Sequence, residues 1–586
     1  MNFKWRLLTL NSLFLLAGIL LISRLFYFSV LASDNFTAIA ESQQNTTLEV
    51  SAKRGEILTA DGNALVANQP AFFTFLKRTE EPFSAELIDE ISPIIYNSIS
   101  FSATPSSQLS SSDQKVLITQ TKESLTKRLE DKRLTWIPLA KKITEEQKWA
   151  LESLNIDNLF FEEDQTRLYP EASMSAHLTG FVGFNDQGKD QGFYGLEGFY
   201  QRELAGRPGI IRQEKDAFNQ PILMGEYLSQ SKLDGKQLLL HLDKSLQYMV
   251  EKKLKKSLEQ FGAKAGSVTI MDPHTGAILA MASLPSYDPK EYTRYEPNLF
   301  TNPVVSDAFE PGSIFKVMVM AAAIDSKAVK KETKCDICDQ PVKIDKYTIK
   351  TWNDEYQANA NMTDVIVHSD NVGMVFIGQK LGLDKFLDYF KKFGFTQNTG
   401  IDLQDELAPD PKPDNKWTYV DLATASFGQG FVATSMQLVQ AVSVIANGGS
   451  LVEPHMVNKV ISNNKEVTIP VKIKNKVISK ETAKVVTEMM VAAAKEGEAK
   501  WTNTGGYKVA GKTGTAQVAF SGKYQEEKTN ASFIGFAPAD DPKFVMLVTL
   551  KEPSTSQWAS ETAAPLWFSI AQELFNHFNI IPDPVN

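Results

Sequence analysis

Glu310-Pro311-Gly312-Ser313-Ile314-Phe315-Lys316 leads directly into the apolar segment 317–324. Pro311-Gly312 ends the preceding element, and Ser313 opens a helical run that is apolar on every side after Lys316. A helix without a polar face belongs in the centre of a domain. We therefore predict a buried helix that carries Ser313 at its start and Lys316 one turn later on the same face.

These two side chains have the chemistry of an activated nucleophile. A serine at the start of a helix lies beside free backbone N–H groups and the positive end of the helix dipole. Desolvation lowers the pKa of a lysine in so apolar a helix, so Lys316 can act as a base toward Ser313. The structural alternative is an N-cap serine with an incidental lysine. The same Ser-x-x-Lys spacing occurs in polar loops or charged helices at Ser112, Ser124, Ser229 and Ser462.

A second motif, Ser369-Asp370-Asn371, lies in a short connection between two predicted helical stretches. A hydroxyl at Ser369 can pass a proton between the lysine and a leaving amine, and Asn371 can hold a substrate amide. A helix cap is the alternative interpretation. Neighbouring His368 has no acidic partner at a recognisable spacing, and the chain has no Gly-x-Ser-x-Gly elbow for a Ser–His triad. We therefore interpret His368 as structural.

The third motif, Lys512-Thr513-Gly514-Thr515, occurs once and lies inside a predicted strand. Side chains alternate along a strand, so Thr513 and Thr515 share one face and Lys512 points to the other. The two hydroxyls are candidates for binding a substrate carboxylate, while Lys512 raises the local positive potential. Gly514 lets another part of the backbone approach closely. The backbone N–H groups of Thr515 and Ser313 are candidates for an oxyanion hole.

Composition limits the classes of function. The chain has 586 residues, enough for about three to four domains, and is 43% hydrophobic and 22% charged, as expected of packed globular domains. Its formal net charge of −9 argues against a nucleic-acid partner, because phosphate binding needs concentrated Lys and Arg. We expect no cofactor.

The N-terminal segment differs from the rest. Lys4 and Arg6 precede an apolar run that extends to Leu31 with one interruption at Arg24, long enough to span a bilayer. The preceding positive residues favour a cytoplasmic N-terminus. A cleaved signal peptide is the alternative, because Val30-x-Ala32 resembles a cleavage site. We expect an uncleaved single-pass anchor, with the rest of the chain outside the cytoplasm.

The two cysteines, Cys335 and Cys338, have the spacing Cys-x-x-Cys. Outside the cytoplasm a disulfide between them is chemically permitted. Free thiols remain an alternative, as does a metal or redox role. No second Cys or His pair follows at ligand spacing, and no βαβ context for a redox motif is apparent. We expect no metal site.

Periodicity predicts an α+β chain. A strand, an amphipathic helix and a hairpin precede the Ser313 helix, helices dominate the middle, and three strands lie near the end. A sheet with strands from both ends of the domain and helices between them is expected. The predicted ranges are a strand at 237–242, a helix at 244–261, a hairpin at 266–283 and strands at 508–518, 531–536 and 543–550. Upstream we predict strands in 47–66, a Ser-rich loop at 101–114, two helices in 115–154, turns and short strands in 180–209 and a linker at 229–235.

Together these motifs resemble the class B penicillin-binding proteins over essentially the whole chain. Further matching segments near the three motifs are Gly428-Gln429-Gly430 and 533–538. Upstream matches to the family's non-catalytic pedestal are Arg54-Gly55-Glu56-Ile57, 167–170, 176–180 and 195–198. The departures are modest: Thr59-Ala60 replace a frequent Asp-Arg, and the usual paired glycines are missing before Ala563.

The resemblance implies an architecture of three parts. Residues 1–34 would form a cytoplasmic tip and transmembrane anchor, and 35–232 an elongated mixed pedestal of the dimerisation type with a lobe around 71–160. Residues 233–586 would form a transpeptidase domain, an antiparallel sheet with helices on both sides.

The resemblance also implies D,D-transpeptidation of peptidoglycan. Ser313 would attack the D-Ala–D-Ala amide of one stem peptide and be released by an amine of a neighbouring stem. Lys316 would be the acylation base, Ser369 a proton relay and Asn371 a group that positions the donor. The donor carboxylate would be held by Lys512, Thr513 and Thr515. β-Lactams would acylate Ser313, and a membrane partner that polymerises glycan strands is implied.

Three competing functions share this nucleophile. A D,D-carboxypeptidase or a β-lactamase would deliver water to the acyl-enzyme, but no clear second carboxylate base is found. A non-turnover β-lactam sensor would couple the domain to a multispan segment, and only one span is predicted.

Overall fold

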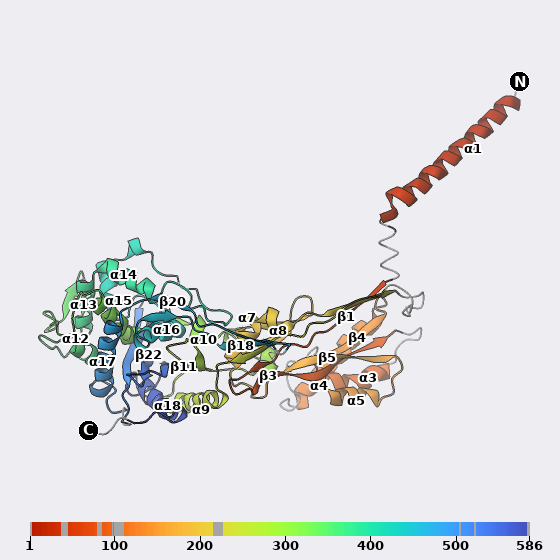
Figure 1. Cartoon of the computed structure of the whole chain (residues 1–586). Helices are drawn as coiled ribbons and strands as arrows, with labels where there is room; N and C mark the ends of the chain where they lie inside the picture. The colour runs from red at the N-terminus through yellow and green to blue at the C-terminus, as the bar shows by residue number, and fades with distance from the viewer. Residues whose placement is uncertain are drawn as a thin grey trace. The chain divides into compact units, whose positions relative to one another are not determined.

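The computed structural model describes residues 3–34, 36, 45–78, 85–96, 98, 111–214, 227–408, 410–463, 465–502, 506–520 and 523–582. Most of the Ser-rich segment 101–114 therefore lies outside the described residues. The chain divides into two compact units, Met1–Arg54 with Ala205–Gly235, and Gly55–Leu204 with Lys236–Asn586. Figure 1 labels many of the elements of both units.

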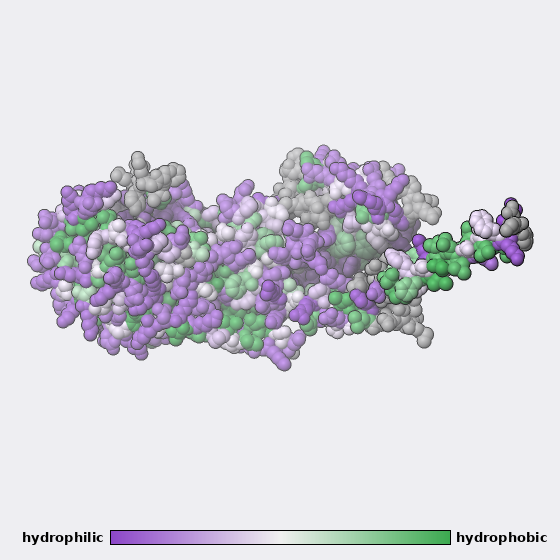
Figure 2. All heavy atoms as spheres, turned by 90° about the horizontal axis from the view of Figure 1, so that it is seen from above, coloured by the Kyte–Doolittle hydropathy of each residue, from purple (hydrophilic) through white to green (hydrophobic). Residues whose placement is uncertain are grey.

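The first unit contains the predicted N-terminal helix. Helix α1 (Phe3–Phe26) continues into a π-helical turn, η1 (Tyr27–Leu31). Within Lys4–Leu31, a window of 18 residues has a mean hydropathy of 2.1 and is unburied, and Figure 2 shows apolar side chains along this helix. It is long and apolar enough to cross a membrane, as predicted. The same unit holds an antiparallel sheet in the order β1-β8-β9, with β1 Asn45–Val50, β8 Gly209–Glu214 and β9 Tyr227–Gln230.

The second unit contains a seven-stranded sheet whose strands come from both halves of the chain. Its order is β19-β18-β10-β2-β3-β4, with β5 also paired to β3. The strands are β2 Ile57–Leu58, β3 Ala64–Lys77, β4 Trp136–Ile143, β5 Leu159–Leu168, β10 Gln237–Leu240, β18 Val457–Ser462 and β19 Lys465–Thr468. Helices α3 (Ala85–Ile95), α4 (Ser111–Glu130) and α5 (Glu145–Glu152) share a separate apolar core with β3 and β4.

Strand β4 is a feature that the sequence prediction missed. Two helices were expected in 115–154, and both form as α4 and α5, but β4 lies between them. Pro138 and two lysines interrupt its apolar pattern. The strand is nevertheless formed because Ile137, Leu139 and Ile143 are fully buried and β3 pairs with it. Pairing with a strand that is distant in the sequence here outweighs the local pattern of apolar and polar residues.

Five short elements occupy 176–205: two short strands of the kind predicted for 180–209, and three small helices in addition. They are α6 Ala176–Thr179, β6 Phe181–Phe184, β7 Asp190–Phe193, α7 Gly195–Phe199 and α8 Gln201–Ala205. A buried ion pair fastens this region: an Arg167 guanidinium nitrogen lies 2.7 Å from Glu197 Oε1, and Arg167 also donates to the Gly55 carbonyl.

The central sheet of the second unit is antiparallel throughout, in the order β12-β11-β23-β22-β21. The strands are β11 Ala265–Met271, β12 Ile278–Leu284, β21 Ala510–Phe520, β22 Lys523–Ala537 and β23 Phe544–Lys551. The predicted hairpin forms β11 and β12, and the three predicted late strands form the rest. Strands from both ends of the domain therefore pair, and β21 is an edge strand.

Helices cover both faces of this sheet. On one face, α9 (Lys244–Phe261) and α18 (Ala563–His577) pack on Val268, Phe533 and Val548, and Figure 1 shows them side by side. Asp243 caps the N-terminus of helix α9, because its side chain accepts a hydrogen bond from the Leu246 N–H. On the other face, α11 (Lys316–Asp325) and α16 (Ser435–Ala446) share a core with Ile534 and Leu547.

The second unit contains further short strands and helices. They are η3 Pro289–Arg294, η4 Pro297–Leu299, α10 Pro303–Ser306, β13 Ala308–Phe309, η5 Gly312–Phe315, β14 Val342–Ile344, β15 Tyr347–Ile349, α12 Met362–Val367, α13 Asn371–Leu381, α14 Leu383–Lys392, η6 Asp414–Lys416, α15 Tyr419–Ser426, β16 Ala433–Thr434, β17 Ser450–Val452, β20 Ile473–Lys476 and α17 Lys480–Glu496. The α+β class and the antiparallel sheet between helices are confirmed.

Candidate active site

Ser313 lies in the 3₁₀ turn η5, directly before helix α11. The sequence predicted one uninterrupted helix from Ser313, so the tight first turn is a difference. Gly312 has a positive φ of 56° and donates its N–H to the Gly428 carbonyl at 2.9 Å. Gly428 allows this approach because a Cβ there would lie 2.0 Å from the Gly312 oxygen. The two glycine segments singled out in the sequence therefore meet beside Ser313.

Lys316 begins α11 and is fully buried. Its side-chain nitrogen donates to the Ser369 carbonyl at 2.6 Å, to Ser369 Oγ at 3.3 Å and to Asn371 Oδ1 at 2.7 Å. Burial, reinforced by the neighbouring Lys512 cation, lowers the pKa of Lys316 to about 7. A lysine with this pKa is substantially neutral at physiological pH and can accept a proton.

The loop between α12 and α13 presents Ser369, Asp370 and Asn371 to Lys316, as the sequence predicted for an interhelical connection. Asp370 caps α13 by accepting from the Val372 N–H at 2.8 Å. Ser369 adopts a positive φ of 54°, which costs about 1–2 kcal/mol for a residue with a Cβ. The Lys316 bond to its carbonyl helps to hold this conformation. His368 is exposed and is not brought to the cluster.

Lys512 approaches the same serine from strand β21. Its Nζ donates to Ser369 Oγ at 3.0 Å and to Thr513 Oγ1 at 3.1 Å. Burial lowers the pKa of Lys512, and the Glu498 carboxylate opposes that effect. Ser369 Oγ therefore lies between two buried lysine nitrogens, one from α11 and one from β21.

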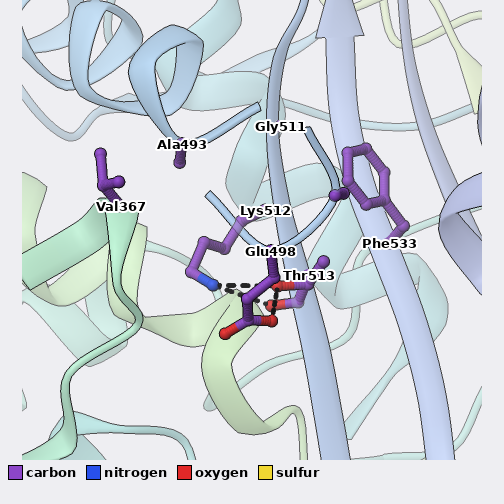
Figure 3. Close-up of a pocket in the computed structure, with 8 residues that line it drawn as sticks. Val367, Ala493, Glu498, Gly511, Lys512, Thr513 and Phe533 are labelled. Carbon is purple, nitrogen blue, oxygen red and sulfur yellow. Dashed lines mark hydrogen bonds between the residues drawn. The ribbon is translucent and has the colours of Figure 1, made fainter. Parts of the chain in front are cut away.

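The three residues after Lys512 have different surroundings. Thr513 is buried, and its hydroxyl donates to Glu498 Oε2 at 2.7 Å, as Figure 3 shows. Gly514 faces η5 so closely that a Cβ would lie 2.7 Å from Ile314 Cγ2. Thr515 is partly exposed and accepts from the Ala559 N–H at 3.1 Å. Of the two threonines, only Thr515 is open to a ligand.

The edge position of β21 leaves one side of the strand without a neighbouring strand. Alternate N–H groups of an edge strand point away from its one partner. The first N–H groups of a helix likewise have no partner within it. The Thr515 and Ser313 backbone groups predicted for an oxyanion hole lie on these two elements, which pack against each other.

Sequence reasoning missed three side chains around the site. Glu498, in the turn after α17, contacts Thr513, and no motif in the sequence marks it. Trp352 and Trp558 form an edge-to-face pair with ring centroids 5.2 Å apart. Trp352 donates to the His368 carbonyl, and Ala559 next to Trp558 donates to Thr515. These segments are more than 200 residues apart in sequence, so only the tertiary fold joins them.

The two cysteines are joined in the structure by a Cys335–Cys338 disulfide, and both are buried. They lie beyond the end of α11, before the β14–β15 hairpin. Within the described ranges, no group of three or more His, Cys, Asp or Glu side chains is arranged to hold a metal ion.

Comparison with known proteins identifies the family. The penicillin binding protein transpeptidase domain matches residues 266–575, and the penicillin-binding protein dimerisation domain matches residues 49–240. Stage V sporulation protein D of Bacillus subtilis is 30% identical over 570 residues, which cover 96% of this chain and 84% of that protein. The chain belongs to the class B penicillin-binding proteins.

Two further similarities extend over nearly the whole chain. The peptidoglycan D,D-transpeptidase FtsI homolog of Mesostigma viride is 28% identical over 597 residues, 97% of this chain and 95% of that protein. The crystal structure of penicillin binding protein 3 from Mycobacterium tuberculosis complexed with aztreonam has a TM-score of 0.68 at 22% identity. It covers 92% of this chain and 98% of that chain. The structural likeness shows that the fold is that of a penicillin-binding protein.

In this class B penicillin-binding protein, all three motifs lie inside the segment matched to the transpeptidase domain. The buried Arg167–Glu197 pair lies inside the segment matched to the dimerisation domain. The resemblance inferred from the sequence is therefore confirmed at the level of the family.

Proposed function

We propose that this protein is a peptidoglycan D,D-transpeptidase that works through an acyl-enzyme on Ser313. The observation that carries the proposal is the convergence of Lys316 and Lys512 on Ser369 beside the η5 turn that holds Ser313. The transpeptidase family match and the D,D-transpeptidase relatives support it.

Acylation begins with neutral Lys316, which takes the hydroxyl proton of Ser313 as Oγ attacks the carbonyl carbon of the D-Ala–D-Ala amide. The backbone N–H groups of Ser313 and Thr515 stabilise the oxyanion. Ser369 Oγ, within 3.3 Å of the Lys316 nitrogen and 3.0 Å of the Lys512 nitrogen, relays the proton to the leaving amine. The C–N bond breaks, and D-alanine leaves.

Deacylation reverses these proton transfers. The amine of a second stem peptide attacks the ester carbonyl and loses a proton through Ser369 Oγ to neutral Lys316. Lys316 then returns a proton to Ser313 Oγ as the ester C–O bond breaks. Asn371, fixed by Lys316 and by the Lys350 carbonyl, positions the donor amide. Charged Lys512 and the Thr515 hydroxyl bind the donor carboxylate. Thr513 and Gly514 shape this subsite, with Thr513 bracing Lys512 from behind.

The proposal includes the placement of the chain at the membrane. Residues 1–34 anchor it with a cytoplasmic N-terminus, because Lys4 and Arg6 precede the span. Residues 35–232 form the pedestal, with its lobe around 71–160, and residues 233–586 form the catalytic domain outside the cytoplasm. A membrane partner that polymerises glycan strands would supply the substrate, and division or elongation machinery would recruit the enzyme.

The reaction can be tested on the full chain in detergent with a stem peptide ending in D-Ala–D-Ala and an amine acceptor. We expect equimolar release of D-alanine and formation of the amide product, both lost in Ser313→Ala. Release of D-alanine with only the hydrolysed peptide as product would contradict transpeptidation and favour a carboxypeptidase.

A further inference from the structure

The Glu498 carboxylate is the one acidic group of the described site that touches the Lys512-Thr513-Gly514 strand. It lies just past the end of α17 and lines a small pocket with Val367, Ala493 and Lys512 (Figure 3). Within the described site, Glu498 contacts the motif through the hydrogen bond that Thr513 Oγ1 donates to Oε2 at 2.7 Å. The carboxylate therefore acts on Lys512 through another side chain.

The Thr513 hydroxyl links the Lys512 ammonium to the Glu498 carboxylate, and the direction of both hydrogen bonds is fixed. A threonine hydroxyl has one proton, and here it is given to Glu498. The lone pairs of Oγ1 are then free to accept from Lys512 Nζ, 3.1 Å away. The hydrogen bonds therefore run from the Lys512 ammonium to the Thr513 hydroxyl and from there to the Glu498 carboxylate. The same Lys512 Nζ also donates to Ser369 Oγ at 3.0 Å.

The titratable groups around Lys512 show which carboxylate can serve as its counter-ion. Lys316 faces the cluster from α11, and Asp370 faces it from the loop before α13. His368 next to Asp370 is exposed. Asp370 is engaged at the N-terminus of α13 by the Val372 N–H. Glu498 is thus the carboxylate available to offset the desolvation of Lys512.

We propose that Glu498 is a positioning residue that, through Thr513, keeps Lys512 protonated and directed at Ser369. The assignment rests on the proposed function. It gives the two buried lysines different roles: Lys316 accepts protons, while Lys512 stays a cation. The charged Lys512 in turn helps to hold the pKa of Lys316 low.

The test is the pH profile of acylation by a fluorescent penicillin, measured as a second-order rate constant on the full chain. In Glu498→Gln the hydrogen-bond geometry can persist but the charge is lost. We expect the alkaline limb, which reports loss of the Lys512 proton, to move to lower pH by about 0.5–1 pH unit. The acid limb should move in the same direction by less, because Glu498 also favours charged Lys316.

Two variants serve as controls. Glu498→Asp keeps the charge and should restore the alkaline limb toward wild type. Glu496→Gln removes a carboxylate two residues away that is exposed, and should leave the whole profile unchanged. Thermal denaturation of each variant reports the folded fraction.

The outcomes separate this proposal from the proposed function. A uniform fall in rate at every pH, with unmoved limbs, would mean that Glu498 only supports the turn after α17, and an unchanged profile would mean that it has no role. Either result overturns the positioning proposal. Absence of acylation at Ser313 in the wild type would instead overturn the proposed function.

Discussion

At the residue scale, Lys316 is the side chain whose environment departs most from that of an ordinary lysine. It is fully buried, yet it makes three hydrogen bonds to the Ser369–Asn371 loop. The sequence predicted this desolvation because every residue from 317 to 324 is apolar. It did not predict the surroundings of Thr513, whose hydroxyl faces Glu498, because strand alternation says which face a side chain takes and not what covers that face.

The pKa of Lys316 predicts the acid limb of catalysis. Lys316 must lose its proton to serve as a base, and its pKa is lowered to about 7. The rate constant for acylation of the wild-type protein by a penicillin should therefore rise with pH through about 7, up to the alkaline limb that reports loss of the Lys512 proton. Stopped-flow fluorescence between pH 5 and about 9 measures this. A rate that is flat down to pH 5 would show that Lys316 is not the base.

At the scale of elements, the site is the junction of the η5 turn, the α12–α13 loop and edge strand β21. The strands and helices that carry these pieces were predictable from periodicity, and the hairpin, α9 and the late strands lie where expected. Strand β4 and Glu498 were not predictable. The first depends on pairing with β3, and the second depends on the turn after α17 lying against β21.

The contact between β21 and η5 predicts the effect of a methyl group at Gly514. A Cβ there would lie 2.7 Å from Ile314 Cγ2 and 3.2 Å from the Pro311 carbonyl oxygen. Overpacking of this kind costs about 1–3 kcal/mol. The overpacked contact should displace the η5 turn and Ser313 with it. If the strain is lost from the stabilisation of the transition state, acylation of Gly514→Ala should be slower by about tenfold to a hundredfold.

The matched variant for this test is the double change Gly514→Ala with Ile314→Ala. Removal of Cγ2 relieves the closest contact, so part of the lost acylation rate should return even though Ile314→Ala alone lowers the melting temperature. Strictly additive losses in the double variant would argue against this contact as the cause.

At the scale of the whole molecule, an apolar N-terminal helix belongs to one compact unit and the catalytic sheet to the other. The seven-stranded sheet takes β2, β3, β4 and β5 from one side of the boundary predicted at residue 232, and β10, β18 and β19 from the other. Local sequence patterns do not reveal such pairing between distant strands. The family resemblance nevertheless identified the architecture, because its motifs are spread along the chain.

The central claim is that Ser313 is the single acylated serine of this chain. The most direct measurement is to treat the full-length protein with a labelled penicillin, digest it and locate the label by mass spectrometry. We predict one labelled peptide containing Ser313, and no label in Ser313→Ala. Label on Ser112, Ser124, Ser229, Ser462 or any other serine, or label that persists in Ser313→Ala, would contradict the account.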